Sequence, residues 1–168
     1  MELLEGIFSR RSVRSYRDEP VSAGDLHQIL VAGSRAPSGL NNQPWRFVVI
    51  RSREVKDDLA ELTRYRRIVS SAPLLIAVFI DRQAIYNEVK DHQGIGACIQ
   101  NMLLAAHGLG LGAVWLGEIL KSADEVRARL GVADVMELMA VLAIGHPAGP
   151  AGELTGRKPL DQLLLKEL

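Results

Sequence analysis

Four short segments of the chain have the length and the residue types of β-strands. They are residues 45–50, which are rich in aromatic and β-branched side chains, and residues 74–80, 113–116 and 138–144. The second and the fourth are continuously apolar instead of alternating with polar residues, a pattern typical of strands covered on both faces. We therefore expect a small β-sheet packed between helices.

Helical spacing of apolar residues separates these segments. Ser22 and Asp25 have the spacing of a capping box ahead of the apolar positions 26–30, and Gly33 stands where such a helix would end. Residues 54–62 and 123–130 predict two further helices, the first of them polar and on the surface.

The most apolar of the predicted helices covers residues 95–107. Ile95, Ile99 and Met102 share one face of it, while Cys98 and Leu104 make other sides apolar too. A helix that is apolar on most sides is deeply buried or buried in a subunit interface. Together, the predicted elements describe one mixed α+β domain that spans residues 1–168.

Composition and charge narrow the class of protein. The chain has 168 residues, 48% of them hydrophobic, and its 20 basic residues balance 20 acidic ones, so we expect a globular domain and no nucleic acid partner. Its one cysteine, Cys98, makes no internal disulfide, and no zinc-type spacing is present. The charged N-terminus is unlike a signal peptide, and residues 74–80 are too few to cross a bilayer. We expect a cytoplasmic protein without a membrane segment.

The first segment with candidate chemistry is residues 10–16, which follow a short helical stretch. They hold Arg10, Arg11 and Arg14 together with two serines. A guanidinium group can bind two phosphate oxygens at once, and serine hydroxyls can complete such a phosphate site. Considered alone, the segment fits better a solvated basic loop that pairs with Asp18 and Glu19, because runs of charge usually form solvated faces.

A second candidate is the loop at residues 36–45. Two prolines, a glycine, two asparagines and a glutamine lie there just before a predicted strand. Such a loop is rigid, and its amides offer both donors and acceptors to the edge of a heteroaromatic ring. The alternative is an ordinary helix-to-strand connection.

Glycines and a basic pair mark two more segments. Residues 108–113 fit G-x-G-x-x-A, but they follow a helix and enter a strand, which is the reverse of a dinucleotide-binding motif. Gly117, at the end of that strand, would let a flat ligand approach the backbone. In the tail, Arg157 and Lys158 form a second basic cluster that could share a phosphate with the first.

Catalytic side chains of the usual kinds are not grouped in the sequence. The four histidines share no ligand spacing, Ser38 lacks the G-x-S-x-G context, and Cys98 stands in an apolar helical stretch. The sequence therefore offers binding groups in place of an acid–base set. This is expected where a cofactor carries the chemistry.

In its ordered set of motifs the chain resembles the flavin-dependent nitroreductase family. The resemblance is carried by Arg-Arg-Ser-Val-Arg at 10–14, Ala-Pro-Ser-Gly at 36–39 with Asn41, Gln-Pro-Trp at 43–45, residues 100–107, Gly-Leu-Gly at 110–112, Trp-Leu-Gly at 115–117, Ile-Gly-His-Pro at 144–147 and Arg-Lys-Pro-Leu at 157–160. These motifs stand in the family's order and span nearly the whole chain.

The resemblance implies a nitroreductase-like fold, with a small mixed β-sheet flanked by helices, in an interlocked homodimer that holds two FMN molecules at the subunit interface. It implies that the tail, residues 147–168, wraps the partner subunit. The FMN-binding residues that it implies fall into three groups: Arg10, Arg11, Ser12, Arg14, Arg157 and Lys158 around the phosphate, Pro37, Ser38, Gly39 and Asn41 at the ring from the other subunit, and Leu116 and Gly117 at the ring edge.

The family often places a cation near the flavin just before its second strand. Arg64, Arg66 and Arg67 are candidates for that place here, and we select Arg67 because of its spacing to residue 74. The chain is short, so little room is left for the helical insertions that cover the active site in longer members. We expect an open pocket, or one shaped by Tyr65 and Tyr86.

The function implied is that of an FMN-dependent NAD(P)H oxidoreductase. A hydride passes through flavin N5 to an electron-poor acceptor, such as a nitroaromatic or a quinone, by a ping-pong mechanism, and no side chain is assigned as catalytic. The alternatives are sibling reactions on the same fold, namely flavin fragmentation, reductive dehalogenation and azoline dehydrogenation, or a flavin-binding protein without turnover.

Overall fold

A four-stranded β-sheet forms the centre of the molecule in the computed structural model, which describes residues 2–150, 152 and 156–168. Its strands are β1 (Trp45–Ile50), β2 (Leu74–Asp81), β3 (Gly112–Leu116) and β4 (Met136–Gly145), arranged across the sheet in the order β1-β2-β4-β3. All three neighbouring pairs are antiparallel, and an isolated bridge between Ser12 and Ala113 adds a parallel pairing. The four predicted strands are confirmed.

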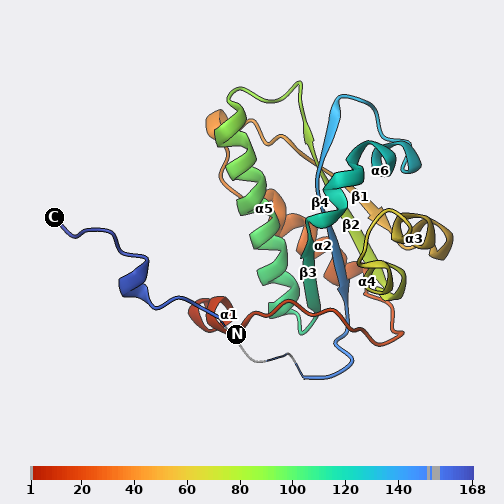
Figure 1. Cartoon of the computed structure of the whole chain (residues 1–168), viewed down its shortest axis with the longest axis horizontal. Helices are drawn as coiled ribbons and strands as arrows, with labels where there is room; N and C mark the ends of the chain where they lie inside the picture. Colours follow the sequence, from red (N-terminus) through yellow and green to blue (C-terminus); the bar gives the residue numbers. More distant parts are fainter. Residues whose placement is uncertain (1, 151, 153–155) are drawn as a thin grey trace.

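Helices cover both faces of this sheet (Figure 1). On one face lie α2 (Ala23–Ser34) and the long α5 (Glu88–Gly108). On the other lie α3 (Arg53–Ala60), α4 (Arg66–Ser71) and α6 (Ala123–Arg129). The short α1 (Leu3–Ser9) packs beside the C-terminal end of α5, and the tail runs past it away from the body of the molecule. Three 3-10 turns complete the described elements, namely η1 (Gly39–Asn41), η2 (Glu118–Ser122) and η3 (Leu160–Gln162).

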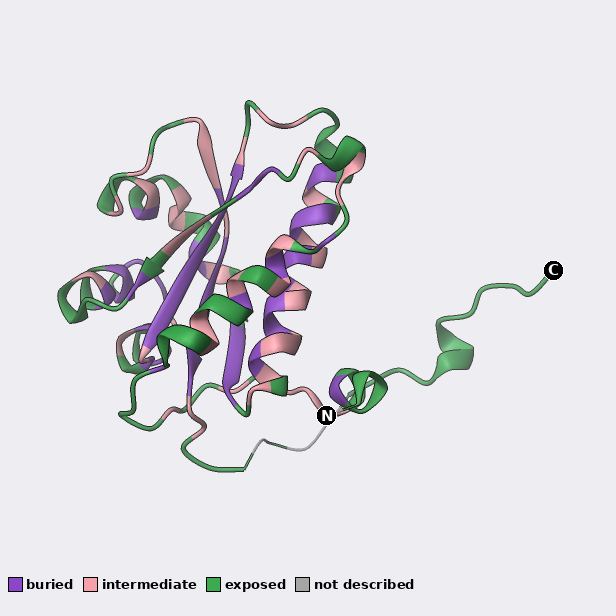
Figure 2. Ribbon diagram, turned by 180° about the vertical axis from the view of Figure 1, so that it is seen from behind, coloured by how far each residue is buried: buried purple, intermediate pink, exposed green. Residues whose placement is uncertain are grey.

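The two-sided burial of the sheet explains the continuously apolar strands. In β2, Ile76 and Val78 face the layer of α2 and α5, whereas Ala77 and Phe79 face the opposite layer. All four are fully buried. Figure 2 shows most of the strand residues buried, with exposed residues on the outer sides of the helices, in the loops, on part of β1 and along the tail.

Two details of the helices differ from the sequence prediction. Helix α2 begins as expected, since the Ser22 hydroxyl accepts from the Asp25 backbone N–H at 2.9 Å, but it does not end at Gly33. Gly33 lies inside its last turn, where a Cβ atom would come within 2.7 Å of Met102 on α5, so the residue permits close helix packing. Helix α4 was not predicted, because its six residues show no apolar period and it is held by burial of Ile68 and Val69.

Helix α5 is buried on one side only. Ile95, Ile99 and Met102 are buried against the sheet, while Leu104 on another side is half-exposed. Within a single chain the helix is therefore not fully buried. Burial of its apolar outer side in a subunit interface stays a prediction. None of the described helices is both long and apolar enough to cross a membrane.

Candidate functional site

The arginine segment is held against the edge of the sheet. The Val13 backbone N–H donates to the Ala113 carbonyl at 3.0 Å, beside the Ser12–Ala113 bridge, so the segment extends the sheet beyond β3. The Tyr16 hydroxyl contacts two carbonyl oxygens, that of Val13 at 2.6 Å and that of Ala143 on β4 at 2.9 Å. Burial raises the pKa of Tyr16, which keeps this hydroxyl protonated as a donor. The backbone on which the arginines stand is thus fixed by the sheet.

Arg10 has the environment of an anion-binding group. It is half-buried, and its Nε atom is buried with no hydrogen-bond partner among the residues that the structure describes. Burial lowers the pKa of Arg10, and the positive charges of Arg157 and Arg11 lower it further. Three guanidinium groups therefore repel one another at this point of the surface, and an anion between them would relieve that repulsion.

The Arg11 guanidinium forms hydrogen bonds within the protein. Its Nη1 atom donates to the carbonyls of Phe8 and Arg10 at 2.9 and 3.0 Å, at the C-terminal end of α1. A cation at this position satisfies carbonyls that a helix end leaves unpaired. Arg11 thus holds α1 in place and contributes charge at the same time.

Two adjoining hollows border the arginine segment. One, of about 260 Å³, is lined by Arg10, Arg11, His107 on α5 and residues 147 and 149. The other, also of about 260 Å³, is lined by Ser12, Arg14 and residues 148–150. The loop after β4 closes back on this segment, since the Ala148 backbone N–H donates to the Ser15 carbonyl at 3.1 Å. Arg14 itself is exposed.

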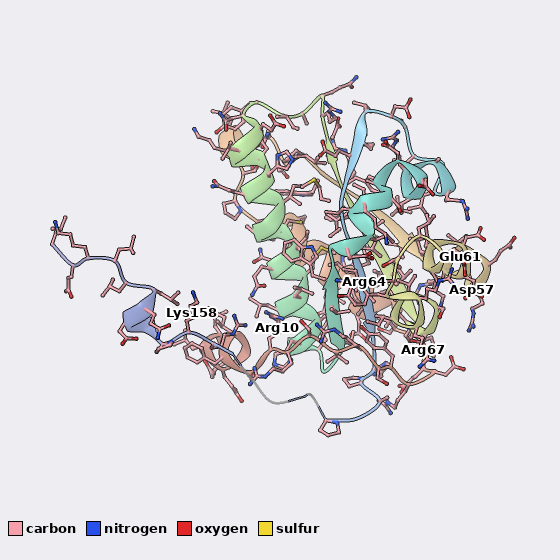
Figure 3. All side chains as sticks on the ribbon, viewed as in Figure 1. Arg10, Asp57, Glu61, Arg64, Arg67 and Lys158 are labelled. Carbon is pink, nitrogen blue, oxygen red and sulfur yellow. The ribbon has the colours of Figure 1, made fainter. Side chains whose placement is uncertain are left out.

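The predicted basic pair of the tail lies on this side of the molecule. Figure 3 shows Lys158 next to α1, on the same side as Arg10, and Arg157 is close enough to Arg10 to shift its pKa. Both tail residues are exposed. Of the predicted wrapping tail, 147–168, residues 151 and 153–155 lie outside the described residues.

The loop that carries Pro37, Ser38, Gly39 and Asn41 is strained. Leu40, Asn41 and Gln43 have φ values of 52°, 56° and 47°, in the left-handed region that side chains other than glycine rarely adopt. Such strain persists only where the surroundings impose it, and it clusters at binding sites.

Hydrogen bonds within the loop and from α5 impose that conformation. Ser38 Oγ accepts from the Gln43 backbone N–H at 3.1 Å, and Asn42 Nδ2 donates to Asp91 Oδ1 at 2.8 Å. Asp91 is 1% exposed and lies in the first turn of α5. The loop is therefore anchored at the N-terminal end of that helix.

The end of β3 is open where Gly117 stands. Leu116 is buried, whereas Gly117 is exposed, and a Cβ atom there would meet nothing within 4 Å. The next residue, Glu118, fixes a neighbouring turn, because its Oε2 accepts from Thr63 Oγ1 at 2.6 Å and from the Arg64 backbone N–H at 3.2 Å. The fold itself does not require a glycine at position 117.

The three candidate arginines before β2 occupy different places. Arg67 is exposed on α4, on the face of the sheet opposite α5, and Figure 3 shows it far from Arg10 and Lys158. Arg66 pairs with Glu61. Arg64 lies beside the end of β3 through its backbone contact with Glu118.

Two groups of the predicted site residues lie at opposite ends of α5. The arginine segment lies by His107, near its C-terminal end, and the loop at 37–39 lies by Gly94. Thirteen residues of helix separate His107 from Gly94, which is about 20 Å at 1.5 Å per residue. One chain does not bring the two groups into a single pocket.

Four further residues position this site and were not selected from the sequence. Tyr16 and Asp91 anchor the arginine segment and the loop, Glu118 fixes the turn by Gly117, and His107 bonds to Ser9 with its Nε2 atom 2.7 Å from the hydroxyl. Burial lowers the pKa of His107, and Arg10 and Arg11 lower it further. Tyr16 and His107 stood inside segments that the sequence analysis singled out, whereas Asp91 and Glu118 are single polar residues with partners distant in sequence.

Comparison with known proteins identifies the family. The Nitroreductase family matches residues 7–66 and 62–146. Over 152 residues the chain is 36% identical to the NADH dehydrogenase/NAD(P)H nitroreductase of Archaeoglobus fulgidus, covering 87% of this chain and 86% of that protein. The chain therefore belongs to the nitroreductase family.

Solved structures agree with this assignment. A nitroreductase from Desulfovibrio desulfuricans, crystallised in complex with FMN, has a TM-score of 0.94 and 51% identity over 100% of this chain and 98% of that one. The NADPH:FMN oxidoreductase of Vibrio harveyi, complexed with NAD+, has a TM-score of 0.90 and 25% identity over 98% of this chain but 76% of that one. The predicted family and fold class are confirmed, and the chain is shorter than the Vibrio protein, as expected.

Proposed function

We propose that this chain is an FMN-dependent NAD(P)H oxidoreductase that reduces electron-poor aromatic acceptors such as nitroaromatics or quinones. The observation that carries the proposal is the buried Nε of Arg10, which has no hydrogen-bond partner among the described residues and lies beside the charges of Arg11 and Arg157. A phosphate group supplies the acceptor oxygens and the negative charge that this cluster lacks. The FMN complex of the Desulfovibrio nitroreductase supports FMN as the source of that phosphate.

The remaining predicted residues would complete the phosphate site and hold the ring. Ser12 and Arg14 line the hollow next to Arg10, and Leu116 and Gly117 leave open backbone for a flat ring at the end of β3. Lys158 would join Arg157 at the phosphate. Arg67 stays our predicted cation for the reduced ring, with Arg64 as its competitor because Arg64 lies nearer to Gly117 in the fold.

When bound, FMN supplies the centre that takes a hydride from NAD(P)H and passes it to the acceptor. The chain's own residues bind the cofactor, orient the two flat substrates and exclude water from them. Because one open face serves both substrates, they bind in turn, and we expect ping-pong kinetics. Protons for the acceptor come from water, so no side chain is assigned as catalytic.

The site requires a second copy of the chain. Pro37, Ser38, Gly39 and Asn41 lie about 20 Å of helix away from the arginines of their own chain, so they would complete the site of the partner subunit. Exposed leucines on α1 and on the tail, and the half-exposed side of α5, provide the apolar surface for an interlocked homodimer. A cytoplasmic location remains part of the proposal on the sequence evidence.

A visible absorption spectrum of the purified protein tests the function first. We expect flavin bands that bleach when NADH or NADPH is added without oxygen, and that return when a quinone is added. Flavin bands that neither nucleotide bleaches would contradict the oxidoreductase and favour a flavin carrier. A colourless protein that takes up no added FMN would contradict the cofactor as well.

A further inference from the structure

A cavity beside the strained loop includes Lys90 and Gln93 in its lining, two residues to which the proposed function gives no role. It has a volume of about 290 Å³, and its lining includes Pro37, Ser38, Tyr86, Lys90 and Gln93. The aromatic ring and the amino group come from the turn between β2 and α5 and from the first turn of α5. The cavity thus combines an aromatic surface, a cation and two neutral polar groups.

Tyr86 is held firmly in this wall. Its ring lies so close to Gly39 that a Cβ atom there would be 2.1 Å from Tyr86 Cε1, so only glycine allows the contact. Its backbone N–H donates to Asp91 Oδ2 at 2.9 Å, an oxygen that also accepts from Asn87. Because the same carboxylate binds Asn42 of the strained loop, the Tyr86 backbone and the loop are fixed relative to each other, and Tyr86 is 43% exposed.

Lys90 brings a free positive charge to the cavity. Its Nζ atom lies 5.6 Å from the centre of the Tyr86 ring, and it forms no salt bridge within the described part of the chain. The nearest acids along the helix are engaged or face water, since Asp91 is buried under three hydrogen bonds and Glu88 is exposed. An ammonium group over an aromatic ring, with Ser38 and Gln93 beside it, suits an anionic group attached to a flat ring.

We propose that this cavity binds the anionic group of an aromatic substrate, with the ring against Tyr86 and the anion on Lys90. This deepens and rests on the proposed function, in which the loop at 37–39 lies beside the flavin of the partner subunit. Two substrates have that chemistry: an acceptor ring bearing a carboxylate, and the phosphorylated nucleotide NADPH. The site therefore selects for charge, either in the acceptor or in the donor.

The acceptor arm is tested by binding to the oxidised FMN-loaded protein, without turnover. Calorimetry would compare para-nitrobenzoate with the neutral para-nitrobenzyl alcohol. We expect Lys90→Gln to weaken binding of the acid by about fivefold, the scale of one exposed ion pair, and to leave the alcohol unchanged. Lys90→Arg should retain the acid, and Arg53→Gln, which removes an exposed charge on α3, should change neither.

The donor arm compares KM for NADPH and NADH. If the anion belongs to the nucleotide, Lys90→Gln raises KM for NADPH about fivefold and leaves KM for NADH unchanged. Tyr86→Phe should keep the affinity for whichever ring binds, whereas Tyr86→Ala should lower it for acid and alcohol alike. A loss of discrimination in either comparison would support the site. The comparison that changes would identify the ligand as the acceptor or as NADPH.

One result overturns the inference and spares the proposed function. It is an FMN-loaded Lys90→Gln protein that NAD(P)H reduces normally and that shows the wild-type ratios of acid to alcohol and of NADPH to NADH. A wild-type protein that takes up no FMN would instead overturn the proposed function. Measuring the FMN content of each variant separates the two failures.

Discussion

Arg10 is the residue on which the proposed phosphate site most depends. The guanidinium is half-buried at the end of α1, with one nitrogen lacking a partner among the described residues and two other arginines close to it. Repulsion of this kind costs folding free energy that an anion returns on binding. Stability of the protein and affinity for the phosphate are therefore linked through this residue.

We predict that Arg10→Ala and Arg14→Ala each weaken FMN binding by about tenfold or more, because a hydrogen bond to a charged group contributes about 1.5–3 kcal/mol. Quenching of flavin fluorescence during titration of the apoprotein measures the dissociation constant. Arg53→Ala, an exposed arginine on α3, is the matched control. Unchanged FMN affinity in both variants would remove the phosphate assignment.

Glu118 gives a prediction about pH. Hydrogen bonds from Lys121 and then Thr63 hold its pKa at about 2, below its ordinary value of 4.5. A carboxylate with a lowered pKa stabilises the fold fully above 4.5, and this contribution is lost as the pH falls towards 2. Glu118→Gln should therefore lower the free energy of unfolding at neutral pH, and the difference from the wild type should vanish as the pH approaches 2.

Urea unfolding of both proteins across that pH range measures the difference. Glu125→Gln, an exposed acid on α6, is the control and should follow the wild type throughout. A difference between Glu118→Gln and the wild type that stays constant down to pH 2 would show that ionisation of Glu118 is not its source.

At the scale of elements, the first turn of α5 joins two loops. Burial alone would raise the pKa of Asp91, but hydrogen bonds from Asn87, Asn42 and Tyr86 lower it overall. The carboxylate thereby connects the strained loop at 37–43 with the turn before α5. Two segments that are far apart in sequence thus share one buried acceptor.

Replacing that acceptor should loosen both segments. Asp91→Asn leaves one oxygen where two accept, and it places an amide N–H₂ among donors, so we expect a loss of about 1–3 kcal/mol in the free energy of unfolding. Urea denaturation provides the measurement, and Glu88→Gln in the same turn is the exposed control. Equal stability of the two variants would contradict the anchoring role.

At the scale of the whole molecule, apolar surface points to the second subunit. Leucines of the tail are exposed, with Leu165 at 99%, as are Leu3, Leu4 and Phe8 of α1. We predict a dimer of twice the 18.4 kDa chain mass. Leu164→Ser with Leu165→Ser should raise its dissociation constant by about tenfold or more, since burial of a leucine contributes about 1.5–3 kcal/mol.

Sedimentation of the wild type and of this double variant tests the prediction. The exposed Val89, in the first turn of α5, offers a control as Val89→Ser. A wild type that sediments as a monomer while binding FMN tightly would contradict both the dimer and the composite site. In a mixed dimer of an Arg10→Ala chain and an Asn41→Ala chain, one of the two sites combines an intact Arg10 with an intact Asn41. Such dimers should therefore bind FMN at one of their two sites.

The sequence by itself determined the layers and the family. Continuous apolar runs at 74–80 and 138–144 predict strands buried on both faces, and the sheet confirms them because only such strands fit between two helical layers. The ordered motifs identified the nitroreductase family, as the comparisons confirm. The local sequence was sufficient to predict the strands and the family, because the apolar runs and the motif residues are each contiguous in the chain.

Only the tertiary structure decided which of these residues lie together. Gly33 reads as a helix stop in sequence but proves to be a contact with Met102, and α4 shows no period because its stability comes from burial. The acceptors Asp91 and Glu118 fix the site through partners tens of residues away, which no local pattern reveals. The separation of the arginines from the loop at 37–39 likewise follows from the length of α5, and our proposal of a second chain rests on this distance.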